Sequence, residues 1–486
     1  MSVFELCPQC RLEYENPADR RFHAEPVACA ACGPSLYFKP ASHDGGVTRG
    51  NEPALAAALD TIRTGGIIAV RGIGGYHLVC DAADDAAVAS LRSRKRRPHK
   101  PLAVMFPFTG RDGLESIRRS VVMDEAAAAQ LLDPIRPIVV LGRRSDCPLS
   151  PLLAPGLGDL GVFLPYSPLH QLLLDDFGRP LVATSGNVSG EPVITSVEDA
   201  ERRLGGIADA FLHHDRDIVR PADDAVVRPL AGQTRPIRLG RGSAPLELTL
   251  ATPLDAPVLA IGGQDKVTVA LGFGDRVMVS PHIGDRSTPR AFDHPVRLAG
   301  DVPRLYRAEP AAIACDLHPG FTGSQWARRQ NLPVIRVQHH AAHASAVAAE
   351  HPLVRRWLVF AWDGVGYGDD GTLWGGEALI GAPGSWRRVA SLRTFRPPGG
   401  DLVAHAPWRS AAALMWEAGL DYAPPATQDH GGVVRKAWTA GLNAPPTSAV
   451  GRLFDAAAAL IGNIGETTFE GQGAMQIGRA SCRERV

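Results

Sequence analysis

Hydrophobic and polar positions follow a pattern that predicts two α/β regions in this chain. Apolar residues at helical spacing in 54–66 (ALAAALDTIRTGG) predict an amphipathic helix that ends at Gly-Gly. The next segment, 67–82 (IIAVRGIGGYHLVCDA), predicts two short buried strands around a Gly-rich turn. Residues 84–97 predict a further helix, because acidic residues open it and basic residues close it, as the helix dipole favours.

A second α/β region begins after a proline-spaced stretch at 247–257 (ELTLATPLDAP). Beyond it, 258–284 has the pattern of strands joined by Gly- and Asp-containing turns, and 358–381 repeats this style. Residues 1–40 lack apolar periodicity and contain paired cysteines. The pattern therefore predicts a multidomain α/β protein with three parts, which are a small module at 1–40 and domains at 52–246 and 256–486.

Composition narrows the class of protein but not its chemistry. The 486 residues exceed the size at which a single core usually stops growing. Lys plus Arg and Asp plus Glu both number 51, so no net field favours nucleic acid or an anionic membrane surface. The sequence has no signal peptide and no apolar run near the roughly 20 residues that span a bilayer. We therefore expect a cytoplasmic protein that binds neither nucleic acid nor membrane.

Four of the eight cysteines form two C-x-x-C pairs, Cys7 with Cys10 and Cys29 with Cys32. Two such pairs can supply four thiolates to a tetrahedral zinc ion, and a closed four-sulfur site leaves no position for a substrate. The alternative is a pair of redox-active dithiols. The clustering of the four cysteines favours a structural Zn²⁺ that folds the 1–40 module.

Residues 336–351 (RVQHHAAHASAVAAEH) hold four histidines. His339 and His343 are four positions apart, so on a helix both imidazoles lie on one face, a common two-ligand arrangement. Asp363, at the end of the predicted strand WLVFAWDG, is the nearest carboxylate that could complete a metal site. Solvent-facing or core histidines are the alternative. His340 lies off the shared face, where a supporting or substrate-contacting role fits better.

Two stretches of the 52–246 region carry groups that suit phosphate. A basic run at 94–100 includes Lys95, Arg97 and Lys100, and the turn ATSGN holds Ser185 and Asn187 after a strand. Cationic side chains, hydroxyls and backbone N–H groups can hold phosphate oxygens. Taken singly, a basic run is usually a solvated face and SGN is an ordinary loop sequence.

Together these two stretches resemble the YrdC/Sua5 family. Its K-x-R…K-P-L pattern matches Lys95, Arg97 and Lys100, and its S-x-N pattern matches Ser185 and Asn187. The resemblance implies a wide, twisted α/β domain that binds ATP with Mg²⁺ and forms a carbamoyl-type adenylate. Attack of a carbamate oxygen on the α-phosphate builds up charge that fixed cations stabilise.

The Gly-rich turn DGVGYGDDGTLWGGE follows the histidine pair. Gly364 and Gly366 in it leave room for the backbone to approach a phosphate, although such a turn alone is weak evidence. With the histidines, it resembles the actin-like, sugar-kinase fold of the Kae1/TsaD carbamoyl-transfer enzymes. That resemblance implies a nucleotide beside Gly364 and Gly366, and a divalent metal, iron or zinc, held by His339, His343 and Asp363.

All three parts, in this order, resemble the HypF-type carbamoyltransferases of nickel–iron hydrogenase maturation. The stretch from Cys7 to Pro34 nearly reproduces their zinc-finger pattern, and IACDLHPGF, VQHHAAHA, PPGGDLVAHAPWR and GRLFDAAAAL extend the match to about Met475. The resemblance implies carbamoyl phosphate and ATP as substrates, with AMP and pyrophosphate as products. It also implies transfer of the carbamoyl group to the C-terminal cysteine thiolate of a partner, HypE, for synthesis of the cyanide ligands of iron. It assigns no catalytic residue.

The chain departs from that family at both ends. The family usually begins with an acylphosphatase-like domain and a first zinc finger and continues into a second lobe, whereas the final IGRASCRERV does not follow it. We expect a fragment whose transfer domain lacks one metal ligand. Two alternatives remain, a fused YrdC–Kae1 enzyme for threonylcarbamoyl modification of tRNA and a non-catalytic zinc-binding scaffold. The zinc module and the neutral charge balance favour the hydrogenase-maturation interpretation.

Overall fold

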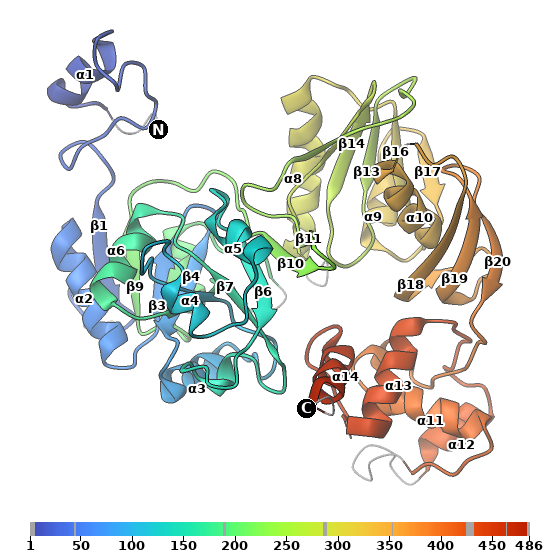
Figure 1. Cartoon of the computed structure of the whole chain (residues 1–486). Coiled ribbons are helices and arrows are strands. Elements are labelled where there is room, and N and C mark those ends of the chain that lie inside the picture. Colours follow the sequence, from blue (N-terminus) through green and yellow to red (C-terminus); the bar gives the residue numbers. More distant parts are fainter. Residues whose placement is uncertain are drawn as a thin grey trace. The chain divides into compact units, whose positions relative to one another are not determined.

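The computed structural model describes residues 5–42, 45–187, 191–284, 289–351, 353–423, 432–462 and 464–483 (Figure 1). The chain separates into two compact units. The first comprises Met1–Arg96, Leu102–Leu153 and Asp159–Arg241, and the second comprises Arg97–Pro101, Ala154–Gly158 and Gly242–Val486. Both units combine strands with helices, which confirms the predicted multidomain α/β class. The predicted domain limits at 40, 52, 246 and 256 stay predictions.

The first unit is built on a mixed sheet of eleven strands with the order β11-β10-β6-β7-β5-β8-β4-β3-β9-β1-β2. The strands are β1 (Leu36–Pro40), β2 (Thr48–Arg49), β3 (Ile68–Arg71), β4 (Tyr76–Asp81), β5 (Val104–Met105), β6 (Ile138–Gly142), β7 (Asp159–Phe163), β8 (Leu181–Ser185), β9 (Ala210–His214), β10 (Val226–Leu230) and β11 (Gln233–Arg238). The helices are α1 (Pro8–Glu15), α2 (Asn51–Arg63), α3 (Asp85–Arg94), α4 (Glu115–Arg118), α5 (Glu125–Leu132), the 3₁₀ turn η1 (Pro151–Leu153), α6 (Pro168–Phe177) and α7 (Val197–Leu204).

Helices α2 and α3 and strands β3 and β4 confirm the pattern expected for 54–97. The buried face of α2 consists of small and aliphatic residues, among them Leu59 and Ile62, that pack in the same core as β3 and β9. Helix α3 begins where the side chain of Asp84 accepts hydrogen bonds from the backbone N–H groups of Ala86 and Ala87. Every residue of β3 and β4 is buried, as the continuous apolar run predicts.

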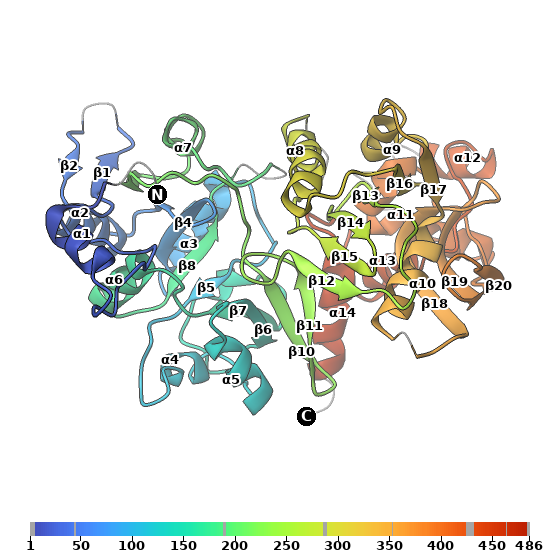
Figure 2. The ribbon, with the colours of Figure 1, turned by 90° about the horizontal axis from the view of Figure 1, so that it is seen from above.

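The second unit contains a six-stranded sheet with the order β12-β15-β14-β13-β16-β17 and a three-stranded sheet with the order β18-β19-β20 (Figure 2). The strands are β12 (Leu246–Thr249), β13 (Val258–Ile261), β14 (Val269–Phe273), β15 (Arg276–Val279), β16 (Ala312–Asp316), β17 (Val334–Val337), β18 (Trp357–Tyr367), β19 (Leu373–Gly381) and β20 (Arg387–Ser391). The helices are α8 (Pro289–Tyr306), α9 (Thr322–Ala327), α10 (His339–Glu350), the 3₁₀ turn η2 (Gly400–Ala404), α11 (Pro407–Glu417), α12 (Val433–Thr439), α13 (Val450–Gly462) and α14 (Gln472–Arg483).

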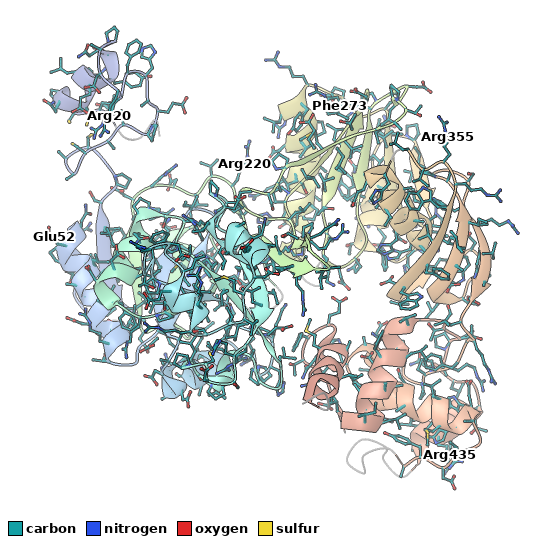
Figure 3. The ribbon with its side chains drawn as sticks, in the orientation of Figure 1. Arg20, Glu52, Arg220, Phe273, Arg355 and Arg435 are labelled. Carbon is teal, nitrogen blue, oxygen red and sulfur yellow. The ribbon has the colours of Figure 1, made fainter. Side chains whose placement is uncertain are left out.

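Packing of α8 against β13 and β14 forms one side of the second unit's core. Leu259, Val269 and Ala299 belong to the same buried cluster. At its margin, the ring of Phe273 packs against that of Tyr306 with centroids 5.8 Å apart (Figure 3). In the part of the chain that the structure describes, no helix is both long enough and apolar enough to cross a membrane.

The parallel pair β16 and β17 determines where the second unit can hold a ligand. Asp316, the last residue of β16, pairs in register with Val337, the last residue of β17. Helix α10 then begins at His339. Because the carboxyl ends of parallel strands meet at one edge of a sheet, Asp316 lies beside the first turn of α10.

Candidate metal and nucleotide sites

The four paired cysteines converge in the first unit. Cys7 is the N-cap of α1 and Cys10 lies inside that helix, whereas Cys29 and Cys32 come from a later turn. The Sγ atoms of Cys7 and Cys29 are 3.6 Å apart, those of Cys29 and Cys32 are 3.8 Å apart, and all four lie within 4.8 Å of one another. A tetrahedral zinc site with Zn–S bonds near 2.3 Å has Sγ–Sγ edges of about 3.8 Å. The four sulfurs therefore fit a closed zinc site.

The environment of Cys32 favours the thiolate form. Hydrogen bonds from the backbone at Cys7 and Cys29 lower the pKa of Cys32 to about 6, although burial opposes this shift. The thiolate, and not the thiol, is the form of cysteine that binds a metal.

The histidine pair and Asp363 also converge, in the second unit. His339 and His343 lie one turn apart on α10, with their Nε2 atoms 3.3 Å from each other. Asp363 projects from β18, and its Oδ2 atom lies 3.1 Å from Nε2 of His339 and 3.9 Å from Nε2 of His343. Two imidazoles and a carboxylate that face one point fit a divalent cation such as iron or zinc.

Sequence reasoning missed Asp316. Its Oδ2 atom lies 2.6 Å from Nδ1 of His339, and its Oδ1 atom accepts a hydrogen bond of 2.7 Å from the backbone N–H of His318. The carboxylate therefore accepts the Nδ1–H of His339, which leaves Nε2, on the side of Asp363, as the ring atom that would bind a metal. Metal-binding histidines are commonly oriented by such a carboxylate. The only signal in the sequence is an aspartate at the end of the apolar run AIACD.

His340 is fully buried next to this cluster. Its Nδ1 atom lies 3.2 Å from the side-chain amide of Gln338, and its Nε2 atom lies 3.8 Å from Oδ2 of Asp363. Burial lowers the pKa of His340 to about 4, so the ring is neutral at physiological pH. The supporting or substrate-contacting role predicted for it stays a prediction.

Gly364 and Gly366 lie inside strand β18 and not in the turn that the sequence pattern indicates. The strand continues to Tyr367, with a register shift between Trp362 and Gly366, and the turn follows at 368–371. A Cβ atom on Gly366 would lie 2.5 Å from Cε1 of His340 and 2.9 Å from Cδ2 of His339. Gly366 thus allows the strand to lie against two imidazole rings. The role predicted for both glycines toward a nucleotide stays a prediction.

Three of the predicted phosphate-binding residues meet in the first unit. The ammonium group of Lys95, which follows α3, donates to the backbone oxygen of Ser185 and, at 3.0 Å, to Oδ1 of Asn187. The hydroxyl of Ser185 donates to the same Oδ1 atom at 2.8 Å. Lys95 is only 3% exposed, so its charge is fixed where β8 ends.

Arg97 and Lys100 lie in the short segment Arg97–Pro101, which groups with the second unit. The guanidinium of Arg97 donates to the backbone oxygens of Lys100 and Pro101 within that segment. These contacts stabilise the conformation of the segment. The predicted role of Arg97 and Lys100 in nucleotide binding stays a prediction.

Four known families match successive parts of the chain. Residues 6–38 match the HypF finger, 60–240 a family described as Telomere recombination (Sua5, YciO and YrdC), 253–350 the HypF Kae1-like domain, and 359–485 the second subdomain of the carbamoyltransferase Kae1-like domain. The carbamoyltransferase HypF of Rhodobacter capsulatus is 42% identical over 492 aligned residues, which cover 98% of this chain and 64% of that protein. This chain belongs to the HypF family.

Other HypF proteins agree with this assignment. The HypF of Synechocystis is 42% identical over 89% of this chain and 58% of its own length. The crystal structure of HypF from T. kodakarensis has a TM-score of 0.91 at 32% identity and covers 98% of this chain. A full-length HypF in its phosphate- and nucleotide-bound form has a TM-score of 0.90 at 38% identity. The chain spans less than two thirds of the length of the HypF proteins it matches first, 64% and 58%.

Proposed function

We propose that this chain performs the ATP-dependent activation and the transfer of a carbamoyl group in nickel–iron hydrogenase maturation. The observation that carries the proposal is the convergence of Lys95, Ser185 and Asn187 in the unit that matches the Sua5 and YrdC family. A fixed ammonium group, a hydroxyl and the turn after a buried strand suit the phosphates of ATP. A HypF relative with the same fold has been crystallised with phosphate and nucleotide.

In the proposed activation step, a carbamate oxygen attacks the α-phosphorus of ATP. The bond from the α-phosphorus to the bridging oxygen breaks, and pyrophosphate leaves together with Mg²⁺. Lys95 stabilises the negative charge that develops on the phosphate oxygens, because it is held in place and needs no reorganisation. The product, carbamoyl adenylate, carries AMP as a good leaving group for a later attack by a thiolate.

We propose that the second unit transfers the activated carbamoyl group to the C-terminal cysteine of HypE. His339, His343 and Asp363 would hold a divalent metal, which can act as a Lewis acid toward an oxygen of the substrate. Residues of the chain orient this centre. Asp316 fixes the orientation of the His339 ring, and Gly366 allows β18, which carries Asp363, to lie against the rings of His339 and His340. The four-cysteine finger would hold Zn²⁺ and stabilise the N-terminal module.

Isotope exchange between ATP and pyrophosphate tests the activation step. Ammonium bicarbonate, which forms carbamate in solution, should stimulate the exchange, whereas omission of ammonium should abolish it. Lys95→Ala and Lys100→Ala should weaken ATP binding with no change in zinc content, and Lys436→Ala in α12 is the matched control for loss of one positive charge. Absence of exchange in a folded, zinc-loaded protein would contradict the proposal and favour a non-catalytic scaffold.

Two further measurements separate the neighbouring functions. A threonylcarbamoyl-AMP synthase of Bacillus subtilis is 28% identical over 164 residues, so L-threonine with bicarbonate is the appropriate alternative substrate. We expect threonine not to stimulate the exchange. Transfer is measured as the mass of one carbamoyl group on the C-terminal peptide of HypE after incubation with ATP and carbamate.

A further inference from the structure

Helix α10 carries a third histidine, His340, whose environment differs from that of the two predicted metal ligands. Its side chain is fully buried, whereas that of His343 is more than half exposed. The His340 ring lies against that of His339, with centroids 5.4 Å apart, and its Nε2 atom is 3.8 Å from Oδ2 of Asp363. His340 therefore borders the metal cluster from inside the protein.

The side-chain amide next to His340, that of Gln338, has a fixed orientation. Its Oε1 atom accepts a hydrogen bond of 2.8 Å from the backbone N–H of Ala341, in the first turn of α10. Its Nε2 atom donates to the backbone oxygen of Tyr367 at 3.2 Å. Because a backbone N–H can only donate and a carbonyl oxygen can only accept, these two bonds determine which end of the amide is the NH₂ group.

The amide of Gln338 in turn determines which nitrogen of His340 carries the proton. The Nε2 atom of Gln338 lies 3.2 Å from Nδ1 of His340, so Nδ1 accepts a hydrogen bond from the NH₂ group and carries no proton. An imidazole ring with an unprotonated Nδ1 has its proton on Nε2. The nitrogen of His340 that lies 3.8 Å from Asp363 is therefore an N–H donor.

This donor is buried and has no hydrogen-bond partner among the described residues. The 3.8 Å to Oδ2 of Asp363 exceeds the length of an N–H···O hydrogen bond, which is about 2.7–3.2 Å. A cation in the cluster cannot satisfy it, since cations bind lone pairs and this nitrogen carries a proton. Buried polar groups are almost always hydrogen-bonded, so the donor calls for an acceptor atom from outside the described chain.

The surroundings of the His340 ring fix the donor and leave its edge open. The ring packs beside that of Trp374, with centroids 6.0 Å apart, while Gln338 holds the opposite nitrogen. A Cβ atom on Gly366 would lie 2.5 Å from Cε1 of His340, the carbon bonded to Nε2. Glycine at this position thus avoids a side chain that would cover the ring next to its donor.

The proposed transfer step supplies an acceptor of the required kind, the carbonyl oxygen of the carbamoyl group. Negative charge develops on this oxygen when a thiolate attacks the carbonyl carbon. A donor that is already in place stabilises such charge without reorganisation, and in a buried site its effect is large.

We infer that the Nε2–H group of His340 donates a hydrogen bond to the carbonyl oxygen of the carbamoyl group during its transfer. This inference rests on the proposed transfer step and adds a residue that contacts the substrate in it. The bond from the thiolate sulfur to the carbonyl carbon forms, and the bond from that carbon to the oxygen of AMP breaks. AMP leaves with the electron pair, and His340 keeps its proton throughout.

His340→Leu tests the inference in the full chain. Leucine has a similar size and no polar atom, so it removes the donor without adding an unpaired group. We expect kcat for carbamoylation of HypE to fall about 10²- to 10³-fold, the usual effect of removing one such donor. The ATP–pyrophosphate exchange rate and the affinity of the histidine cluster for Co²⁺, measured by its ligand-field absorption, should stay within about threefold of the wild type.

Two further variants separate the hydrogen bond from packing. His340→Gln can place an amide N–H near the position of the histidine Nε2, so it should recover at least about tenfold of the kcat lost in the leucine variant. His351→Leu is the matched control, because His351 is exposed and follows the last residue of the same helix. This control should change kcat by less than about twofold.

The possible results of these assays separate the inference from its alternatives. An unchanged kcat in folded His340→Leu overturns it. A loss of Co²⁺ affinity as large as the loss of kcat would assign His340 to support of the metal site through Asp363. A higher KM for ATP with an unchanged kcat would assign the donor to a phosphate group. If the wild type catalyses exchange but does not carbamoylate HypE, the proposed transfer step itself fails, and the inference fails with it.

The position of the proton is measured without any activity. In the ¹⁵N NMR spectrum of the metal-free protein with labelled histidine rings, the signals of His340 are those that disappear in His340→Leu. We expect a protonated Nε2 and an unprotonated Nδ1, as the bond from Gln338 requires. A proton on Nδ1 would overturn the inference.

Discussion

Removal of the Asp316 carboxylate should weaken metal binding at the histidine cluster although no ligand is changed. The side chain of Asp316 is only 6% exposed, and it accepts the Nδ1–H of His339 across 2.6 Å. Loss of such a supporting carboxylate typically lowers metal affinity about 10- to 100-fold, which corresponds to about 1.4–2.8 kcal/mol. We expect Asp316→Ala to fall in this range.

Asp316→Asn distinguishes two reasons for a loss of metal affinity, which are a changed orientation of the His339 ring and a loss of side-chain packing. Both carboxylate oxygens are used as acceptors, one by His339 and one by the backbone N–H of His318. An amide has a single oxygen, so it must turn an NH₂ group toward one of these donors. Facing His339, the NH₂ group would favour the tautomer with its proton on Nε2, which cannot bind a metal. Facing His318, it would lose a buried hydrogen bond. Asparagine should therefore be nearly as harmful as alanine.

Titration of the metal-free protein with Co²⁺ provides the assay. Co²⁺ bound to the four cysteines shows thiolate charge-transfer absorption. Co²⁺ bound to the histidine cluster shows ligand-field bands but no charge-transfer absorption, so the affinity of each site is measured separately. Asp275→Ala, in the exposed turn between β14 and β15, is the control for loss of an acidic side chain. Wild-type affinity in Asp316→Asn would refute the reasoning, since packing alone would then explain any loss in the alanine variant.

Three further changes have defined outcomes. Gly366→Ala places a methyl group against two histidine rings, so it should destabilise the second unit by about 1–3 kcal/mol and weaken Co²⁺ binding. At Gly364 the atom nearest to an added Cβ is 3.9 Å away, so Gly364→Ala should change neither stability nor Co²⁺ binding. Thermal unfolding and the same Co²⁺ titration measure the two effects. Cys29→Ser should remove one zinc equivalent per chain by elemental analysis, whereas Cys147→Ser should remove none. Burial, with the charges of Arg71 and Lys39, lowers the pKa of His213 to about 3. The unfolded chain, with an ordinary histidine pKa near 6.5, therefore binds an extra proton between these pH values, and stability is lost as the pH falls through 6.5. The free energy of unfolding measured by hydrogen exchange of the β9 amides should fall by about 2 kcal/mol between pH 7 and 5 because of His213. This contribution should be absent in His213→Gln.

The features that the sequence predicted well are those carried by neighbouring positions. The C-x-x-C pairs place two thiols on one turn, and the four-residue spacing of His339 and His343 places both rings on one face of α10. Helices α2 and α3 follow from local apolar spacing and from the Asp84 cap. Each of these outcomes depends on interactions within a few residues, which a sequence displays directly.

Contacts between distant strands could not be derived in this way. Asp316 meets His339 only because β16 and β17 are parallel and end in register. The hydrophobic pattern of a single sequence predicts strands but not the order in which they pair. Asp316, which orients the ring of His339, was therefore overlooked, although an aspartate at the end of a strand is the residue type that this role requires.

The reason for a glycine at position 366 also could not be derived from the sequence, because it depends on which atoms lie against the backbone there. A glycine in a Gly/Asp-rich segment indicates that something approaches the backbone closely, but the spacing of glycines does not identify what approaches. In this protein two imidazole rings occupy that space, so the conformational reason for the glycine lies in the protein itself. A phosphate at the same segment would need a different surface of the strand or the turn at 368–371. The pair of alanine substitutions at 364 and 366 therefore tests two separate uses of glycine, and only the substitution at 366 should disturb the histidine cluster.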